Sequence, residues 1–124
     1  EEFIENFIFP GYIPSDEMPL LYNCSSLFLY PSLRESFGLP ILEAMACGVP
    51  VITSNTSSMP EIASNAAIFV NPFDHNEIKD AIVRFFADDN LRVEMKQLGL
   101  KRSSDFTWKS AAEQLLSIYN SFTI

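Results

Sequence analysis

Short runs of β-forming residues alternate with helix-forming segments in this chain, and this alternation constrains its fold most strongly. Strands are expected at residues 7–9, 27–30, 51–53 and 68–70. The run at 27–30 is apolar throughout, which is typical of a strand covered on both faces. Strands that alternate with helices indicate right-handed crossovers and a parallel sheet. The sequence therefore predicts an α/β fold, a Rossmann-like parallel sheet of about four strands with helices on both faces, followed by C-terminal helices.

Two short helices are predicted from local signals. Ser15 is expected to cap a helix that runs to about Cys24, because Asp16 and Glu17 would then lie near the positive end of the helix dipole. A second short helix is expected around residues 60–63, after a polar loop.

The best-marked helix begins near Leu39, between the second and third expected strands. Pro40 stands in its first turn, where a missing N–H does no harm. Gly48 is expected just past its end, because glycine favours the left-handed conformation that terminates many helices.

From residue 74 onward the chain is predicted to be helical. Asp74 with Glu77 resembles a capping box, and further helices are expected at about 91–101 and after Thr107. Two helices carry apolar stripes that we expect to pack in the core. They consist of Ile78, Ala81, Ile82, Phe85 and Phe86 in the first helix, and of Trp108, Ala111, Ala112, Leu115, Leu116, Tyr119 and Phe122 in the last.

Charge and composition argue against several functions. The net charge is −8, from 16 acids against 8 bases, so the surface repels phosphate backbones and no nucleic-acid partner is expected. No run of about 20 apolar residues could span a membrane, and no signal peptide is visible. Cys24 and Cys47 fit free thiols in a reducing cytosol, and no metal site is expected. The start at Glu1 suggests a processed product or a fragment.

The candidate chemistry lies in residues 31–51. Here a strand leads into a polar loop and a helix N-terminus, at the sheet edge where ligands bind in such folds. The backbone N–H groups of Phe37, Gly38 and Leu39 would be free and, with the helix dipole, would form an anion site. Gly38 would also let a ligand approach the backbone closely.

Two carboxylates, Glu35 and Glu43, flank this anion site. A carboxylate can accept two hydrogen bonds from a vicinal diol, so each suits a ribose or a hexose. A phosphate between two sugars would place one sugar near each Glu. Two nearby residues each allow two interpretations. Arg34 is either a solvated loop charge or a partner of the donor phosphate. Glu61 is either an acid in the first turn of a helix or a contact to the donor.

Residues 35–46 closely resemble the Glu-x7-Glu motif of retaining glycosyltransferases with the GT-B fold, in glycosyltransferase family 4 (group 1). The resemblance extends over nearly the whole chain. Further blocks that match the family are Pro10-Gly11-Tyr12-Ile13-Pro14, Leu20 and Tyr22, Pro31-Ser32, Met59-Pro60-Glu61 and Phe106-Thr107-Trp108.

The resemblance implies a role for each motif residue. Glu35 is expected to contact the transferred sugar and act as the catalytic residue, and Glu43 to bind the ribose hydroxyls. The sugar of a nucleotide-sugar substrate would pass to a hydroxyl acceptor with retention at the anomeric carbon, with no cofactor and no obligatory metal. The implied donor-binding residues are Gly11, Tyr12, Ser36, Phe37, Gly38, Leu39 and Glu43.

Two departures from the family indicate that residues 1–124 form a truncated C-terminal donor-binding domain. Family members are much longer and carry an N-terminal acceptor domain, which is absent here. They also use an Arg and a Lys to neutralise the diphosphate, whereas residues 1–33 contain neither. We therefore expect weak donor binding and no activity of the chain alone. The last helix would lack its partner in the N-terminal domain, so it is expected to pack in trans or differently.

Two other functions stay open. A different GT-B enzyme, such as a sugar-nucleotide epimerase or a phosphorylase, would need catalytic acids and bases or a cofactor Lys that the motif does not offer. A non-catalytic sugar-nucleotide-binding or interaction module would reuse the same fold. The loop at residues 54–61 is similar to loops of bacterial mannosyltransferases, which favours GDP-mannose over a UDP-sugar. Family acceptors include lipid-linked glycans, so a cytoplasmic enzyme peripheral to the inner membrane face is expected.

Overall fold

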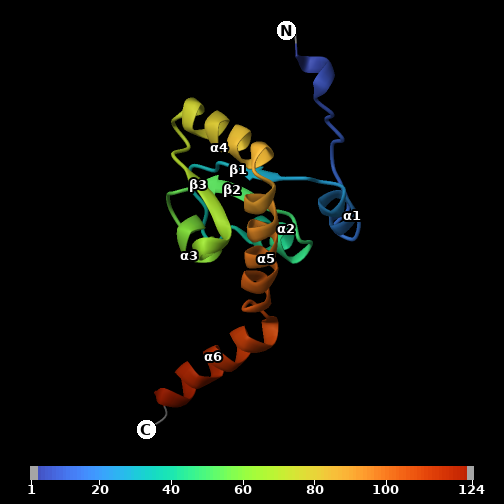
Figure 1. Cartoon of the computed structure of the whole chain (residues 1–124). Coiled ribbons are helices and arrows are strands. Elements are labelled where there is room, and N and C mark those ends of the chain that lie inside the picture. The colour runs from blue at the N-terminus through green and yellow to red at the C-terminus, as the bar shows by residue number, and fades with distance from the viewer. Residues whose placement is uncertain (1–2, 123–124) are drawn as a thin grey trace.

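The computed structural model describes residues 3–122, and its centre is a three-stranded parallel sheet (Figure 1). The strands are β1 (Phe28–Tyr30), β2 (Val51–Ser54) and β3 (Ala67–Val70), in the order β1-β2-β3. Phe28 lies opposite Val51, and Val51 lies opposite Ala67. The α/β class and the parallel sheet are confirmed, but the sheet has three strands rather than four.

The prediction of a strand at residues 7–9 is wrong. This segment follows a short 3-10 helix, Ile4–Asn6, and runs away from the sheet in an extended conformation (Figure 1). Its side chains are exposed, Ile8 by 89%, and the rings of Phe7 and Phe9 stack on each other with centroids 6.3 Å apart. A strand needs a neighbour for its backbone N–H and C=O groups, and the segment lies beside none.

Helices cover both faces of the sheet, as the sequence predicted. On one face Ile52 and Val70 pack against Phe85 of α4 (His75–Ala87). On the other face Val51 packs with α2 (Leu39–Ala46) and α3 (Met59–Ala63). All four residues of β2 are buried, which explains why this central strand contains no charged residue.

The helix α5 (Asp89–Ser104) packs along α2, and it does so through a small residue. A Cβ on Gly99 would stand 3.2 Å from Cγ of Met45, so glycine permits the close approach of the two helices. A second 3-10 helix, Ser64–Ala66, connects α3 to β3.

The first α-helix, α1 (Met18–Asn23), starts later than predicted. Glu17 rather than Ser15 stands at its N-cap, and no side chain caps it. Pro19 gives the physical reason, because a proline fits only in the first turn of a helix, where its missing N–H has no partner. A helix that began at Asp16 would have placed Pro19 where an intrahelical hydrogen bond is needed.

The ends of α2 follow the prediction. Gly38 precedes the helix with a left-handed φ of 95°, and Pro40 lies in the first turn. At the other end Gly48 has a φ of 72°. Its N–H donates to Met45 O at 2.9 Å, and the N–H of Val49 donates to Ala44 O at 2.9 Å. This pair of bonds is a Schellman motif, and it turns the chain into β2.

The later helices are capped by side chains. Asp74 accepts hydrogen bonds from the N–H groups of Asn76 and Glu77, which gives one half of the predicted capping box. The other half does not form, because the Asp74 N–H donates to Asn71 O. Asp88 caps α5, and Thr107 caps α6 (Trp108–Ser121) by accepting from Ser110 N–H.

The last helix contradicts the expectation that its stripe is core. α6 projects away from the sheet (Figure 1), and none of its residues is buried. Trp108 is 90% exposed, and Leu116, Tyr119 and Phe122 are exposed as well. On α4 the stripe does pack as predicted, except that Phe86 points to solvent. Packing of α6 in trans stays a prediction.

Three expected absences concern only the described part of the chain. Over residues 3–122 no helix is both long and apolar enough to cross a bilayer. The same residues hold no cluster of three or more metal-ligating side chains. Cys24 and Cys47 are free thiols, as expected.

Replacing Gly48 by alanine should lower the free energy of unfolding by about 1–2 kcal/mol, because a positive φ disfavours a residue with a Cβ. The added Cβ would also stand 3.1 Å from Cε of Lys96. Urea denaturation measures the change. Gly11→Ala is the matched control, because Gly11 has the same φ of 72° with nothing within 4 Å of the new Cβ. Its segment is exposed and can relax, so equal losses in the two variants would contradict this account.

Candidate functional site

The loop that follows β1 holds Glu35 in a defined position. The hydroxyl of Tyr30, the last residue of the strand, donates to Oε1 of Glu35 at 2.6 Å. Ser32 Oγ donates to the same oxygen at 2.8 Å. These two bonds, with that from Tyr30 the stronger influence, lower the pKa of the Glu35 carboxyl below its ordinary value. Glu35 is therefore a carboxylate at neutral pH, and it is anchored to the end of β1.

The same hydrogen bond also changes the pKa of Tyr30. Burial, followed by the bond to Glu35, raises the pKa of Tyr30 to about 12. The hydroxyl therefore keeps its proton at neutral pH and stays a donor to the carboxylate.

The start of α2 presents unpaired backbone donors. Within residues 3–122 the N–H groups of Ser36, Phe37, Gly38 and Leu39 have no hydrogen-bond acceptor. Phe37 and Leu39 are exposed, whereas Gly38 is buried. Free N–H groups at the positive end of a helix dipole favour an anion, and anion binding by this segment stays a prediction.

Glu43 lies in the second turn of α2 and is held from another direction. The hydroxyl of Tyr22 in α1 donates to its Oε2 at 3.1 Å. Burial and then this hydrogen bond raise the pKa of Tyr22 above its ordinary value, so the hydroxyl stays protonated. The side chain of Glu43 is exposed, which leaves its other oxygen open to a ligand.

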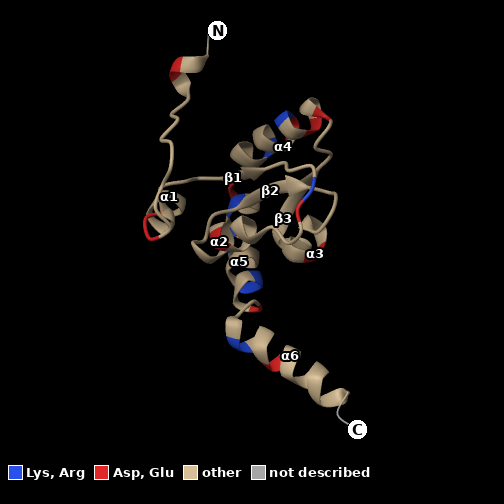
Figure 2. Cartoon of the chain, turned by 180° about the vertical axis from the view of Figure 1, so that it is seen from behind, with Lys and Arg blue, Asp and Glu red and all other residues tan. Residues whose placement is uncertain are grey.

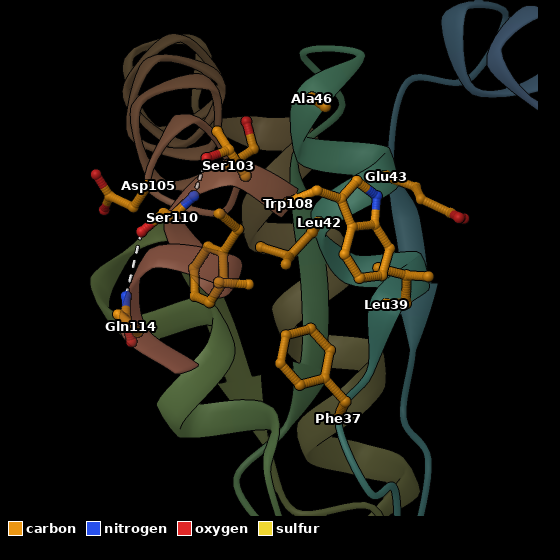
Figure 3. A pocket seen from close by; sticks show the side chains of 13 residues that line it. Phe37, Leu39, Leu42, Glu43, Ala46, Ser103, Asp105, Trp108, Ser110 and Gln114 are labelled. Atoms are coloured by element: carbon orange, nitrogen blue, oxygen red, sulfur yellow. Dashed lines mark hydrogen bonds between the residues drawn. The ribbon is translucent and has the colours of Figure 1, made fainter. Parts of the chain in front are cut away.

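Two hollows adjoin α2, and Glu43 lines both. The larger, of about 750 Å³, lies between α2 and the connection from α5 to α6. Figure 3 shows Phe37, Leu42 and Trp108 turned toward it, while the carboxylate of Glu43 points away. The smaller, of about 230 Å³, lies between α1 and α2. Glu35 lines neither, so the two carboxylates flank the start of α2 without lining a common hollow.

The structure brings together part of the predicted site. Glu35, the Ser36–Leu39 backbone and Glu43 gather around the first turns of α2. Gly11 and Tyr12 lie in the exposed N-terminal segment before α1. Neither residue lines either of the two hollows beside α2. Their place beside a nucleobase stays a prediction.

The hydroxyl groups that hold the two carboxylates and the Glu35 loop were not predicted from the sequence. Tyr22 and Tyr30 each hold one of the two carboxylates, and Ser57 and Ser58 bond the backbone of the Glu35 loop. A strand that ends in tyrosine shortly before a loop glutamate could have indicated the Tyr30 bond. No local pattern could have indicated Tyr22, which is 21 residues from Glu43.

Basic residues are scarce in the sequence before α4. Arg34 is the only lysine or arginine before Lys79 in the sequence. It is exposed and forms no ion pair within the described residues. The other bases lie on α4, α5 and α6 (Figure 2). An anion at the start of α2 would therefore meet mainly backbone N–H groups, although Arg102 stacks on Phe106, whose ring packs against Phe37.

Comparison with known proteins identifies the family. The family model described as "Glycosyl transferases group 1" matches residues 1–102. The chain belongs to the glycosyl transferases group 1 family. It is 40% identical over 109 residues to the O-antigen chain mannosyltransferase B of Escherichia coli, a match that covers 88% of this chain and 29% of that protein. The chain thus spans about 29% of the length of this relative.

Solved structures agree with this family and with a GT-B C-terminal fold. The C-terminal domain of a glycosyl transferase group 1 family protein (LpcC) from Francisella tularensis matches with a TM-score of 0.72 and 29% identity, over 84% of this chain and 58% of that one. Anabaena Alr3699/HepE in complex with UDP and glucose matches with a TM-score of 0.83 and 22% identity. That match covers 93% of this chain and 32% of HepE, and at this identity it shows the fold alone.

Replacing Tyr30 by phenylalanine should raise the pKa of Glu35 toward its ordinary value, because the first of its two hydroxyl donors is lost. The ¹³C shift of the Glu35 carboxyl, followed across pH, measures this change. Tyr12→Phe is the control, because its exposed ring leaves the Glu35 bonds intact.

The same pair of variants tests the effect on stability. A lowered pKa in the folded state adds stability above the unfolded pKa, and this stability is lost as pH falls through the lowered value. The Tyr30→Phe variant should therefore lose less stability on acidification than the wild type. An unchanged Glu35 titration in Tyr30→Phe would show that this hydrogen bond does not set the pKa.

Proposed function

We propose that this chain is the donor-binding part of a retaining GT-B glycosyltransferase of family 4, which transfers a hexose from a nucleotide sugar to a hydroxyl acceptor. One observation carries the proposal. Unpaired N–H groups at residues 36–39 open a helix that is flanked by the anchored carboxylates Glu35 and Glu43. This arrangement suits a diphosphate between two sugars, and it lies within the segment that matches the family.

Each group would then have one task. The N–H groups of Phe37, Gly38 and Leu39 hold the diphosphate, whose negative charge grows as the bond to the anomeric carbon breaks. Glu35, a carboxylate at neutral pH, accepts hydrogen bonds from hydroxyls of the transferred sugar. Glu43 accepts from the ribose diol with the oxygen that Tyr22 leaves free. No residue of the chain is assigned to a metal or a cofactor.

Charge supports the proposal that the chain works within a longer enzyme. A helix N-terminus supplies about half a positive charge, against roughly two negative charges on a diphosphate. No lysine or arginine precedes Arg34, so the missing positive charge would come from other parts of the enzyme. We infer that residues 1–124 are its C-terminal donor domain, that an N-terminal acceptor domain is its partner, and that the chain alone is inactive. The similarity to a solved C-terminal domain supports this assignment.

Two comparisons bear on the donor. The 40% identical relative carries the name O-antigen chain mannosyltransferase, which favours GDP-mannose and a role in polysaccharide synthesis. HepE, at lower identity, has been solved in complex with UDP and glucose, so a UDP-sugar is the alternative. We propose a cytoplasmic enzyme that meets a lipid-linked acceptor at the inner face of the membrane.

Replacing Glu43 by alanine should weaken nucleotide binding by about 1–3 kcal/mol, because charged hydrogen bonds to the ribose hydroxyls are lost. Calorimetry of the chain with GDP and with UDP measures the effect. Glu43→Gln preserves an acceptor for the Tyr22 hydroxyl and removes only the charge, so its loss should be smaller. Glu94→Ala on α5 is the control, because it makes the same charge change at an exposed position outside both hollows. Unchanged affinity in Glu43→Ala would remove the ribose assignment.

Replacing Glu35 by glutamine should lower turnover more than nucleotide affinity, because this residue is assigned to the sugar rather than to the nucleotide. Nucleotide affinity is measured on the chain, and turnover with a nucleotide sugar is measured in the longer enzyme. An amide in this position still accepts from Tyr30 and Ser32, so the loop should remain folded. A variant with unchanged turnover would contradict the catalytic assignment.

A further inference from the structure

The loop that follows β2 bonds the backbone of the loop that follows β1. Residues 54–58 provide four hydroxyl groups, and all of them donate to carbonyl oxygens of residues 32–37. The bonds are Ser54 Oγ to Ser32 O at 2.5 Å, Thr56 Oγ1 to Leu33 O at 3.4 Å, Ser57 Oγ to Glu35 O at 2.7 Å, and Ser58 Oγ to Glu35 O at 3.1 Å and to Phe37 O at 2.9 Å. Ser57 Oγ also accepts from Glu35 N–H at 3.2 Å.

These bonds fix the direction of two unpaired N–H groups. A peptide unit is planar and trans, so its N–H points opposite to its C=O. The carbonyl of Glu35 points to Ser57 and Ser58, so the N–H of Ser36 points away from them. The carbonyl of Phe37 points to Ser58, so the N–H of Gly38 also points away. Both N–H groups lack an acceptor among the described residues, and they face the same way relative to the serines.

The side chain of Ser58 bonds the neighbouring loop and does not cap its own helix. It stands at the N-cap of α3, where a serine side chain commonly accepts from the first turn, yet it makes no capping bond. Pro60 removes one N–H that a cap could have bonded. The hydroxyl instead reaches across to the neighbouring loop, more than 20 residues earlier in the chain.

Ser57 adopts a backbone conformation that favours glycine. Its φ is 56°, in the left-handed region where a residue with a Cβ is disfavoured. Ser57 Oγ accepts from the N–H of Glu35 and donates to the carbonyl of the same residue. A strained serine at this position therefore has a specific set of partners in the Glu35 loop.

We propose that Ser57 and Ser58 are positioning residues that aim the Ser36 and Gly38 N–H groups at the phosphates of a nucleoside diphosphate. This inference rests on the proposed function, because it concerns the same anion site. The site then depends on a second loop, residues 54–58, whose hydroxyl groups bond the Glu35 loop and do not contact the ligand themselves. The ligand class recognised through this loop is the diphosphate, not the nucleoside.

Replacing Ser58 by alanine should weaken binding of GDP and UDP roughly tenfold and leave guanosine and uridine binding unchanged, because only the phosphates meet the aimed N–H groups. Calorimetry or saturation-transfer NMR on the whole chain measures the four ligands. Ser58→Thr keeps the hydroxyl and should retain diphosphate binding. Ser104→Ala is the control, because its Oγ donates to a local carbonyl of α5 at 2.6 Å, outside the site.

Ser57→Gly provides a second test that does not depend on the stability of Ser58→Ala. Glycine suits the φ of 56°, so the variant should unfold at the same or a higher urea concentration than Ser57→Ala. It should nevertheless bind GDP and UDP several-fold more weakly than the wild type, because the Glu35 peptide loses its hydroxyl partner. A merely structural role would make stability and diphosphate affinity change together.

Amide NMR gives the direct readout. On addition of GDP or UDP to the wild-type chain, the ¹H–¹⁵N signals of Ser36 and Gly38 should shift, and in Ser58→Ala they should shift less at equal saturation. If the wild type binds the diphosphates and both serine variants bind them equally well, the positioning role is wrong while the proposed function stands. If nucleoside and diphosphate binding fall equally in the variants, the role is also wrong. If neither the chain nor the longer enzyme binds either diphosphate, both the proposed function and this inference fail.

Discussion

Parallel pairing of β1 with β2 is the constraint on which the site depends. The register places Tyr30 opposite Thr53, so the loops that follow the two strands leave the sheet at the same edge. The hydroxyl groups of residues 54–58 can then reach the carbonyls of residues 32–37. Thr53 begins this pattern inside the sheet, where its Oγ1 donates to Tyr30 O at 2.9 Å. Side-chain hydroxyls thus continue the bonding between the strands beyond the end of the ladder.

Each of the two carboxylates is held by a tyrosine from a different element. Tyr30 ends β1 and bonds Glu35, whereas Tyr22 belongs to α1 and bonds Glu43. The rings of both tyrosines pack against Phe28, with centroids 5.4 Å and 5.5 Å away, so one aromatic group supports both hydroxyl donors. Each of the two acids is therefore linked to the start of β1 through a tyrosine.

The sequence predicted the elements that depend on local chemistry. Gly48, Pro40, Asp74 and Thr107 occupy the helix ends expected of them, because a positive φ, a missing N–H and a short acceptor side chain each favour one kind of position. The cap predicted at Ser15 failed for a local reason, Pro19, but the larger failures came where a partner elsewhere in the chain decides. Residues 7–9 have strand-forming side chains without a neighbouring strand, and the stripe of α6 has helical spacing without a surface to cover it.

The same distinction between local signals and distant partners holds for the candidate site. The motif from Glu35 to Glu43 could be found along the sequence because its members are close together. The hydroxyls of Tyr22, Ser57 and Ser58 could not, because only the fold brings them to the motif. Glu35 is ionised beside the start of α2 and would repel a phosphate bound there. Under the proposed function, the contribution of this chain to diphosphate affinity would come from well-aimed N–H groups, so the residues that set their direction would matter as much as those that touch the ligand.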